Sequence, residues 1–502
     1  MPLEKKHIAV IGAGFAGLSA AAYLAKAGFH VEVFEKNEDI GGRARQLVTG
    51  EGYVFDMGPS WYWMPDVFEK FFNDFGYKAS DFYELMLLDP SFSVIFDQED
   101  VLNVPSGYQE LKALFEEIEP GSGVKLESFM EEAAFKYKVG MENLVYKPGL
   151  SLMEFADKDF IKGVFKLQVF TSFSKYVRKH FSDPRLIALM EFPVLFLGAT
   201  PENTPALYSL MNYAGLKLGT WYPKGGFGMV ISAMKTVCDR LGVKFHLDTP
   251  VRQIKVENDG MVEIRTKLGN QRFDAVIAAA DYHHVETDLL KDRDRNYTPA
   301  YWNKRVMAPS SLIFYLGVSR KVNRLQHHNL FFDEDIKAHA KEIYENPKWP
   351  EKPLFYVCCP SKTDPGVAPE GKENLFILIP IATGLQDGEE IRQSYFDKVM
   401  DRLEKYCGED IRSAIDYRKS YCVTDFITDY NSFRGNAYGL ANTLMQTANL
   451  KPSMRNKKLN NLFYAGQLTV PGPGVPPSII SGHVAANQVI KYLNATAYER
   501  NI

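Results

Sequence analysis

The stretch Gly12-Ala13-Gly14-Phe15-Ala16-Gly17 decides the fold of this protein. An apolar run, residues 7–11 (HIAVI), comes directly before it, and an Ala- and Leu-rich run, residues 18–27, follows it. The second run consists of strong helix formers, and Gly28 is placed to cap the helix. Residues 31–34 (VEVF) then predict a second strand. A strand, a glycine turn, a helix and a second strand together predict a βαβ unit.

The spacing of the glycines predicts that this unit binds a dinucleotide. Gly12 permits a tight turn, Gly14 lets the backbone approach a pyrophosphate, and Gly17 lets the helix pack closely on the strand. The helix N-terminus offers N–H groups and a positive dipole to phosphates. Glu35, at the end of the second strand, is placed to accept hydrogen bonds from ribose hydroxyls and disfavours a 2′-phosphate. The predicted site residues here are Gly12, Ala13, Gly14, Phe15, Ala16, Gly17, Glu35 and Lys36.

Two further glycine motifs distinguish FAD from NAD. Ile40-Gly41-Gly42-Arg43-Ala44 follows the second strand, and it resembles the second glycine pair of flavoproteins of the amine-oxidase and desaturase group. The Arg43 cation can lie beside the pyrophosphate. Phe55-Asp56-Met57-Gly58-Pro59-Ser60 resembles the loop that the same group places near the flavin. We therefore predict FAD as the cofactor, with Gly42, Arg43, Gly58, Pro59 and Ser60 in its site.

Composition excludes several other classes of protein. A chain of 502 residues is too long for one compact core and predicts two or three domains. A net charge of −4 without long runs of like charge gives no electrostatic support for nucleic-acid binding. The five cysteines show no CxxC spacing and no Cys/His cluster, so we expect no metal site, no disulfides, and reduced thiols in the cytoplasm. Residues 1–7 lack the apolar core of a signal peptide.

Residues 459–490 contain no Asp, Glu, Lys or Arg and are long enough to span a bilayer. Four prolines lie within residues 471–477, however, among several glycines. Such a segment cannot continue a helix, and its backbone groups would be unsatisfied in lipid. We expect a buried strand, loop and helix instead.

The predicted fold class is α/β, with a discontinuous Rossmann-like FAD-binding domain into which an α+β substrate domain is inserted. Residues 1–88, 222–300 and 455–502 are assigned to the FAD domain, because 273–281 and 461–467 read as its returning strands. Residues 89–221 are predicted to be a helical segment that contacts substrate and membrane, and residues 301–454 to be the substrate domain. Val251, expected to meet the adenine, Asp281 and Gly466 complete the middle and end of the FAD site.

Over essentially its whole length the sequence resembles the bacterial and fungal phytoene-desaturase family of carotenoid biosynthesis. The resemblance rests on the three glycine motifs, on Trp61-Tyr62-Trp63-Met64-Pro65, Trp221-Tyr222-Pro223-Lys224-Gly225-Gly226 and Gly435-Asn436-Ala437-Tyr438-Gly439, and on Ala465-Gly466 with Pro471-Gly472-Pro473-Gly474-Val475-Pro476. Monoamine oxidases usually have an acid after the Ala-Gly, where this chain has Gln467.

The resemblance implies a 40-carbon polyene substrate and FAD as the only organic cofactor. It implies successive double bonds, from phytoene toward lycopene, by hydride transfer to flavin N5 while a proton leaves the neighbouring carbon. Gly474, Val475 and Pro476 are predicted to open the last helix, from about 478 to 492, with its N-terminus at the pyrimidine end of the flavin.

No residue is identified from the sequence as the proton acceptor, and the catalytic residues stay unknown. His283 and His284 follow the strand that ends at Asp281, and they are interpreted mainly as polar packing near the adenine half. Glu191, in the apolar stretch 186–197, is the stronger candidate because burial would raise its pKa.

A water-insoluble substrate implies contact with a membrane. Residues 155–181 mix Phe and Val with Lys and Arg, as in a helix that lies in the membrane interface, although a core-facing helix with a basic outer face fits as well. We expect a cytoplasmic protein peripherally associated with the membrane.

Several alternatives remain open. The chain could desaturate a later, for example hydroxylated, carotenoid, or be a carotenoid isomerase. A flavin amine oxidase would have two facing aromatic side chains near the flavin. A non-catalytic FAD-bound escort would leave every polyene unchanged. The number of double bonds, the terminal electron acceptor and the oligomeric state are not determined by the sequence.

Overall fold

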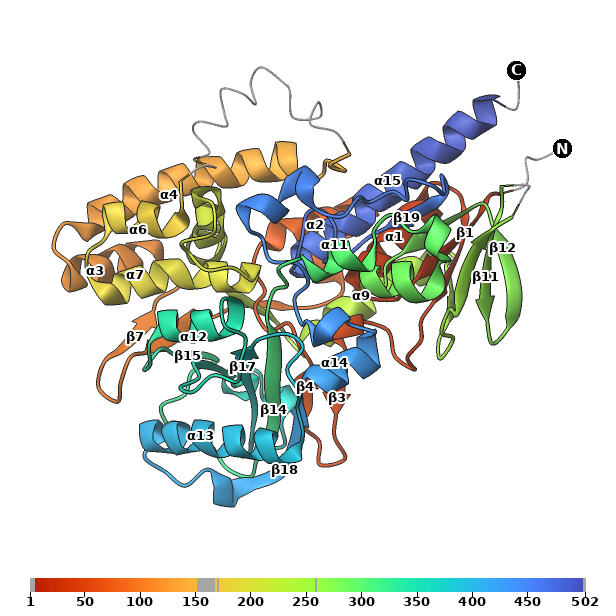
Figure 1. Cartoon of the computed structure of the whole chain (residues 1–502). Helices are drawn as coiled ribbons and strands as arrows, with labels where there is room; N and C mark the ends of the chain where they lie inside the picture. Colours follow the sequence, from red (N-terminus) through yellow and green to blue (C-terminus); the bar gives the residue numbers. More distant parts are fainter. Residues whose placement is uncertain (1–4, 151–167, 169–170, 258–259, 500–502) are drawn as a thin grey trace.

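The computed structural model describes residues 5–150, 168, 171–257 and 260–499, and these residues form two large sheets joined by helices (Figure 1). The first sheet is parallel, with the order β19-β13-β1-β2-β9 among the described residues. Its strands are β1 (His7–Ile11), β2 (His30–Phe34), β9 (Lys244–His246), β13 (Ala275–Ala278) and β19 (Leu462–Tyr464). They come from three separate parts of the chain, so the α/β class with a parallel sheet is confirmed.

Helices α1 (Phe15–Lys26) and α15 (Val475–Glu499) pack on this sheet, and α9 (Phe227–Arg240) packs against α1. Gly12 has φ +100°, as the turn from β1 into α1 requires. A Cβ on Gly17 would lie 1.9 Å from the Gly12 carbonyl oxygen, and one on Gly482 would lie 2.2 Å from that of Ala16. The predicted role of Gly17 in close packing therefore agrees with the structure, and Gly482 lets α15 lie directly against α1.

A smaller antiparallel sheet extends this region. It consists of β10 (Gln253–Val256), β11 (Val262–Thr266) and β12 (Gly269–Phe273). Its first two strands form an antiparallel hairpin, and β12 leads directly into β13.

The second large sheet has the order β18-β14-β17-β16-β15-β6-β7 in the described part of the chain. Strand β14 (Ser310–Val318) lies between β18 and β17, and its successive side chains point alternately into two different apolar clusters. Leu312, Phe314 and Leu316 belong to the apolar cluster that includes the buried side of α13 (Glu389–Cys407), whereas Ile313 and Tyr315 belong to the cluster shared with the parallel sheet. Both faces of β14 are thus buried. The remaining strands of this sheet are β15 (His328–Phe331), β16 (Phe355–Cys358), β17 (Glu373–Ile381) and β18 (Ile415–Tyr421).

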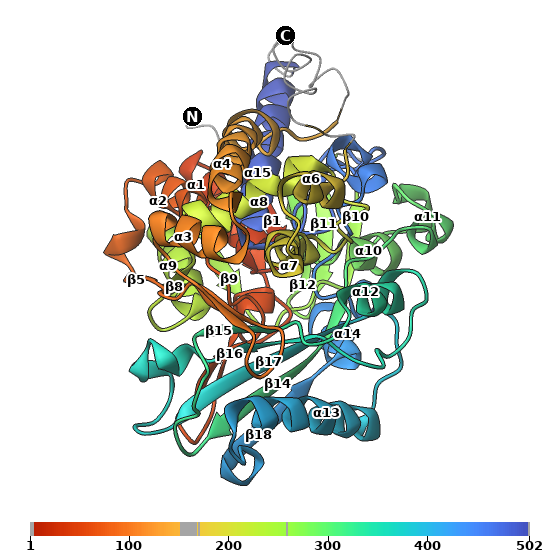
Figure 2. The same cartoon turned by 90° about the vertical axis from the view of Figure 1, so that its left-hand side faces the viewer.

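The prediction that residues 89–221 are helical is wrong for their first part. β6 (Phe92–Ile95) and β7 (Val101–Val104) form a hairpin at the edge of the second sheet, where β6 pairs with β15. These strands have only four residues each, too few to show the period of two clearly. The rest is mainly helical and lies above the second sheet in Figure 2. Its helices include α3 (Tyr108–Ile118), α4 (Ser122–Val139), α6 (Phe173–His180) and α7 (Pro184–Glu191).

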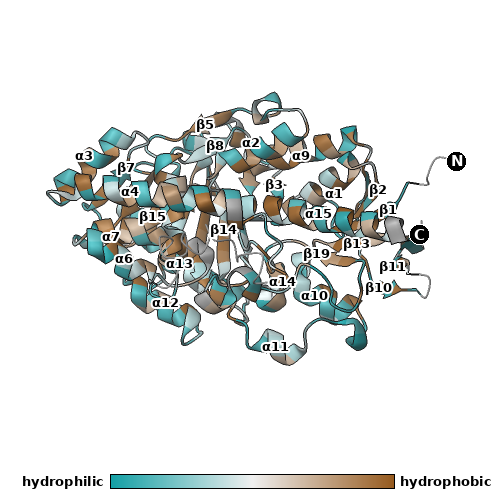
Figure 3. Cartoon of the chain, turned by 90° about the horizontal axis from the view of Figure 1, so that it is seen from above, coloured by the Kyte–Doolittle hydropathy of each residue, from teal (hydrophilic) through white to brown (hydrophobic). Residues whose placement is uncertain are grey.

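Only the end of the predicted interfacial helix, residues 155–181, can be assessed, because residues 151–167 and 169–170 lie outside the described residues. In α6, Phe173, Tyr176 and Val177 are buried, while its lysines and arginine are exposed. Hydrophilic residues dominate the visible surface of α6 in Figure 3. This part is a core-facing helix with a solvated basic face. Within the described ranges, no helix is both long and apolar enough to cross a membrane.

Candidate active site

One continuous cavity of about 480 Å³ connects the parallel sheet with the second sheet. All of the predicted cofactor-site residues line it except Ala13 and Gly17. They form its dinucleotide half: Gly12, Gly14, Phe15, Ala16, Glu35, Lys36, Gly42, Arg43, Gly58, Pro59, Ser60, Val251, Asp281, Gly466, Gly474, Val475 and Pro476. Segments from the start, middle and end of the chain thus meet around one space.

The N-terminus of α1 opens into the dinucleotide half. Gly14 is the N-cap residue, and no side chain of the described residues caps this end of the helix. A Cβ on Gly14 would lie 3.9 Å from its nearest protein neighbours, Gly41 O and Gly42 Cα. The space in front of Gly14 is therefore open, and the free N–H groups at the helix end can bind phosphate oxygens.

Glu35 is held rigidly at the end of β2. Its Oε2 accepts a hydrogen bond from Ala13 N at 2.8 Å, and its Oε1 accepts one from Asn37 N at 2.9 Å. The side chain is buried yet faces the cavity. Because each carboxylate oxygen has a second lone pair, Glu35 can still accept hydrogen bonds from a ribose.

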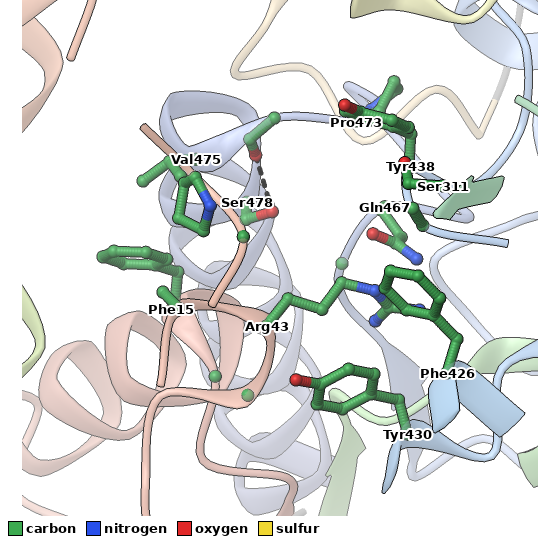
Figure 4. Close-up of a pocket in the computed structure, with 18 of the residues that line it drawn as sticks. Phe15, Arg43, Ser311, Phe426, Tyr430, Tyr438, Gln467, Pro473, Val475 and Ser478 are labelled. Atoms are coloured by element: carbon green, nitrogen blue, oxygen red, sulfur yellow. Dashed lines mark hydrogen bonds between the residues drawn. The ribbon is translucent and has the colours of Figure 1, made fainter. Parts of the chain in front are cut away.

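Arg43 supplies a buried positive charge to the same space (Figure 4). Its Nη2 donates to Ser432 Oγ at 3.1 Å and to the Asn436 carbonyl oxygen at 3.2 Å, and the guanidinium lies 4.9 Å from the centre of the Tyr430 ring. Burial lowers the pKa of Arg43, although an arginine side chain stays charged. Its Nε is buried and has no hydrogen-bond acceptor within the described ranges. A buried cation with an unused donor fits an anionic group such as a pyrophosphate.

Gln467 lies beside Arg43 in Figure 4. With its amide oxygen turned toward the guanidinium, Gln467 accepts a hydrogen bond from Arg43 Nη2 at 3.0 Å. A neutral amide leaves the arginine charge uncompensated at this contact, where an acid would neutralise it. Gln467, which stands where monoamine oxidases usually have an acid, thus leaves the charge of Arg43 free to bind an anionic ligand.

Asp281 links two segments at the edge of the cavity. It accepts hydrogen bonds from His284 N at 3.2 Å and from Phe433 N at 3.3 Å. Burial raises the pKa of this carboxyl, and the nearby Arg43 charge opposes the rise. Val251 is also buried and lines the cavity.

The last helix begins earlier and ends later than predicted. Helix α15 starts at Val475, so Pro476 and Pro477 lie in its first turn, where proline needs no N–H partner. Gly474, with φ +113°, precedes it, and its carbonyl oxygen accepts a hydrogen bond from Ser478 Oγ at 2.7 Å (Figure 4). Gly466 N donates to Ser481 Oγ at 2.9 Å and fixes the preceding loop. The N-terminus of α15 therefore faces the cavity.

The other half of the cavity is apolar and lies between the second sheet and α12 (Ile336–Tyr344). Its aromatic and aliphatic lining residues are Trp61, Trp63, Met64, Phe192, Leu195, Met211, Ile313, Leu330, Phe332, Ile336, Ala340, Ile343, Leu354 and Leu378. His339, on α12, is a polar member of this wall, but Pro380 O lies 2.8 Å from its Nε2 and Leu354 N donates to its Nδ1 at 3.1 Å. Burial lowers the pKa of His339 to about 4, so it is neutral. We refer to this space as the apolar half.

The structure argues against the base candidates taken from the sequence. Glu191 does not line the cavity, although its neighbour Phe192 does. Its Oε2 lies 3.3 Å from Arg178 Nη2, and burial raises its pKa while the Arg178 charge opposes the rise. His283 stacks on Phe433 with ring centres 3.9 Å apart and does not line the cavity either. His284 lines the dinucleotide half, with Nδ1 2.5 Å from Asp288 Oδ2. The interpretation of both histidines as local packing fits these contacts.

Comparison with known proteins agrees with this geometry. Residues 15–490 match the family model described as flavin containing amine oxidoreductase. The chain belongs to this family. As a member it is an FAD-dependent oxidoreductase, and the predicted cofactor is confirmed. The solved structure of a putrescine oxidase variant has the same fold, with a TM-score of 0.63 at 13% identity over 97% of this chain and 99% of that one. An oxidoreductase from Methanosarcina mazei has a TM-score of 0.60 at 17% identity, over 97% and 100%.

Individual members of the family are much more similar in sequence. A carotenoid 3,4-desaturase from Haloarcula japonica is 41% identical over 491 residues, covering 97% of this chain and 99% of the relative. A zeta-carotene-forming phytoene desaturase from Myxococcus xanthus is 31% identical over 500 residues, covering 98% and 95%. The resemblance to the carotenoid-desaturase family is therefore confirmed.

The two halves of the cavity would have different roles in the reaction of this flavoprotein. Bound FAD supplies the hydride acceptor. The N-termini of α1 and α15 and the charge of Arg43 would hold its phosphates and flavin, and Glu35 would accept hydrogen bonds from its ribose. The apolar walls of the other half would exclude water from a substrate bound there.

Proposed function

We propose that this protein is a carotenoid desaturase that forms the double bond between C3 and C4 of its substrate. One observation carries the proposal: a single cavity joins the FAD-binding residues to a long apolar space, in a chain that is 41% identical over nearly its whole length to a carotenoid 3,4-desaturase. Because a polyene exposes only apolar surface, its binding requires a cavity lined by apolar side chains.

Phytoene desaturation, the expectation from the sequence, is the second candidate. It is supported by the Myxococcus relative and by fungal phytoene desaturases at 30% identity. We rank it second because these identities are lower over a similar share of the chain.

The amine-oxidase alternative has less support. A cationic amine in a buried site needs an acidic partner. Among the described lining residues, the carboxylates are Glu35, Asp281 and Asp429, and all three belong to the dinucleotide half. The apolar half therefore suits a hydrocarbon better than an amine.

The test offers the purified, FAD-loaded protein two substrates in detergent or vesicles. One is phytoene, and the other is an acyclic, already conjugated carotenoid with a single bond between C3 and C4. The proposal predicts that the second substrate gains conjugation, seen as a red shift and as the loss of two hydrogens by mass spectrometry. Turnover of phytoene alone would favour the second candidate. Retention of FAD with neither polyene changed would favour the escort interpretation.

We also propose that the protein takes its substrate from a membrane surface. The support for this proposal is a set of three exposed apolar side chains, Val306, Met445 and Leu450, which we call the patch; Met445 is 74% exposed. Gln446 holds two of its segments together, because its side chain bonds Val306 N at 3.0 Å and Val306 O at 2.8 Å. Exposed apolar side chains of this kind can insert into the headgroup region.

Vesicle co-sedimentation tests this patch. Met445→Asp combined with Leu450→Asp should abolish binding while bound FAD is retained. Val48→Asp is the matched control, because Val48 is 67% exposed on β3 (Gln46–Val48), outside the patch. Equal binding of the double variant and the control would contradict the proposal.

A further inference from the structure

A desaturation that delivers a hydride to FAD also releases a proton from the neighbouring carbon, and the following inference rests on the proposed function. Among the described residues that line it, the apolar half offers no ordinary base for this proton. The carboxylates among the described lining residues lie in the dinucleotide half, and both ring nitrogens of His339 are already hydrogen-bonded. The proton therefore needs another route out of the cavity.

A chain of hydrogen-bonding groups begins at Ser60. Ser60 lines the cavity where the loop that carries Gly58 and Pro59 meets the tryptophans of the apolar half. Tyr356 OH donates to Ser60 Oγ at 3.0 Å and also lies 2.6 Å from His328 Nδ1. Tyr356 lines the cavity, whereas His328 is completely buried behind it.

A second histidine lies beside the first and leads to the surface, although no hydrogen bond joins the two rings among the described residues. The rings of His328 and His327 are 4.5 Å apart at their centres, and both Nε2 atoms are buried without a hydrogen-bond partner in the described part of the structure. The Cys358 sulfur and one nitrogen of each histidine ring all lie within 4.8 Å of one another. His327 Nδ1 is 2.6 Å from Thr363 Oγ1, and Thr363 is exposed.

The two imidazoles are suited to pass a proton rather than to keep it. Burial lowers the pKa of His327 to about 3 and holds that of His328 well below its ordinary value, so both rings are neutral. A neutral imidazole accepts a proton at one nitrogen and releases one from the other. The hydroxyls of Ser60, Tyr356 and Thr363 can each accept one proton while giving up another.

We propose that Ser60, Tyr356, His328, His327 and Thr363 form the exit path for the proton that each desaturation releases. The first C–H bond breaks with its electron pair leaving as hydride to the flavin. The neighbouring C–H bond breaks with its proton passing to Ser60, and its electron pair forms the new double bond. Each group along the path passes on one proton, and one proton reaches solvent at Thr363. The step between His328 and His327 requires one ring to rotate or a water molecule to bridge them, because their Nε2 atoms are not hydrogen-bonded in the described part of the chain.

His327, His328 and Cys358 are also residue types that bind transition metals. We favour the proton path because Tyr356 and Ser60 connect this cluster to the cavity and Thr363 connects it to solvent. A bound metal ion would occupy the histidine nitrogens that the path needs. Metal content of the purified protein therefore separates the two.

The test measures flavin reduction by the carotenoid without oxygen. Tyr356→Phe should slow reduction by about 10²-fold, the lower range for a positioned proton acceptor, while FAD content and polyene affinity stay unchanged. The matched control is Tyr62→Phe, because Tyr62 is a buried tyrosine whose OH lies 2.8 Å from Tyr83 OH and which does not line the cavity.

A rescue experiment distinguishes a proton path from mere packing. His327→Gly should also reduce flavin slowly, and added imidazole should restore the rate without changing FAD content. A native rate in Tyr356→Phe, no rescue of His327→Gly, or one metal ion per chain would each overturn the path. If no carotenoid reduces the flavin of the native enzyme, the proposed function fails. If the native enzyme and the variants are all reduced at the same rate, only the proton path fails.

Discussion

Gly14 and Gly17 offer a sharp test of the cofactor site, because the same substitution should have opposite consequences at the two positions. Gly14→Ala places a methyl group in open space, with its nearest protein neighbours at 3.9 Å. Gly17→Ala places it 1.9 Å from the Gly12 carbonyl oxygen, where backbone must move. We expect the first change to impair FAD binding and the second to impair folding.

The magnitudes follow from these distances. Gly14 has φ −77°, which any residue adopts, so the free energy of unfolding of apo Gly14→Ala should change by less than about 1 kcal/mol. The methyl group instead meets the pyrophosphate, and a clash of about 1–3 kcal/mol corresponds to roughly 10- to 100-fold weaker binding. Gly17→Ala should lose about 1–3 kcal/mol or more of stability with or without FAD.

The assay combines urea unfolding of the apoprotein with titration of FAD, followed by the visible absorption of bound flavin. Gly14→Val should lose the yellow cofactor altogether because it adds two more methyl groups at the same place. The reasoning would be refuted if Gly14→Ala bound FAD as tightly as the native protein. It would also be refuted if apo Gly14→Ala were as unstable as Gly17→Ala.

Three further outcomes are expected. Arg43→Ala should weaken FAD binding about 10- to 100-fold, since a hydrogen-bonded charge is lost, and titration at matched ionic strength checks this; native affinity would contradict the role of Arg43. Ala340→Phe, which fills the apolar half from α12, should keep FAD but lose carotenoid binding, as measured by the polyene absorption shift; unchanged binding would place the substrate elsewhere. Burial raises the pKa of Asp56 to about 6, above its unfolded value of 3.8. The contribution of Asp56 to the free energy of unfolding is therefore present below pH 4 and is lost as the pH rises through about 6. Asp56→Asn should flatten this part of the stability profile in urea unfolding, and an unchanged slope would contradict the assignment.

The sequence predicted the parts of the site whose geometry is local. The turn at Gly12, the helix that follows Gly14 and the acid at the end of β2 lie close together in the chain, so their spacing alone defines them. Motifs such as the one around Gly474 could be assigned to the same cavity only by resemblance, because the parallel sheet brings distant segments together.

Contacts between side chains far apart in the sequence could not be predicted from the sequence. Ser60 and Tyr356 are almost three hundred residues apart and meet because β16 borders the cavity. The partners of Arg43, among them Ser432 and Asn436, are equally remote in sequence. Glu191 illustrates the opposite error, since an acid in an apolar stretch indicates burial but not which cavity or partner it faces.

The most direct test of the central claim is to mix the FAD-loaded protein with a carotenoid in the absence of oxygen and record both chromophores together. The flavin absorption should bleach while the polyene absorption shifts to longer wavelength, with one flavin reduced for each double bond gained. A polyene that binds in the cavity and leaves the flavin oxidised would contradict hydride transfer from the polyene to FAD.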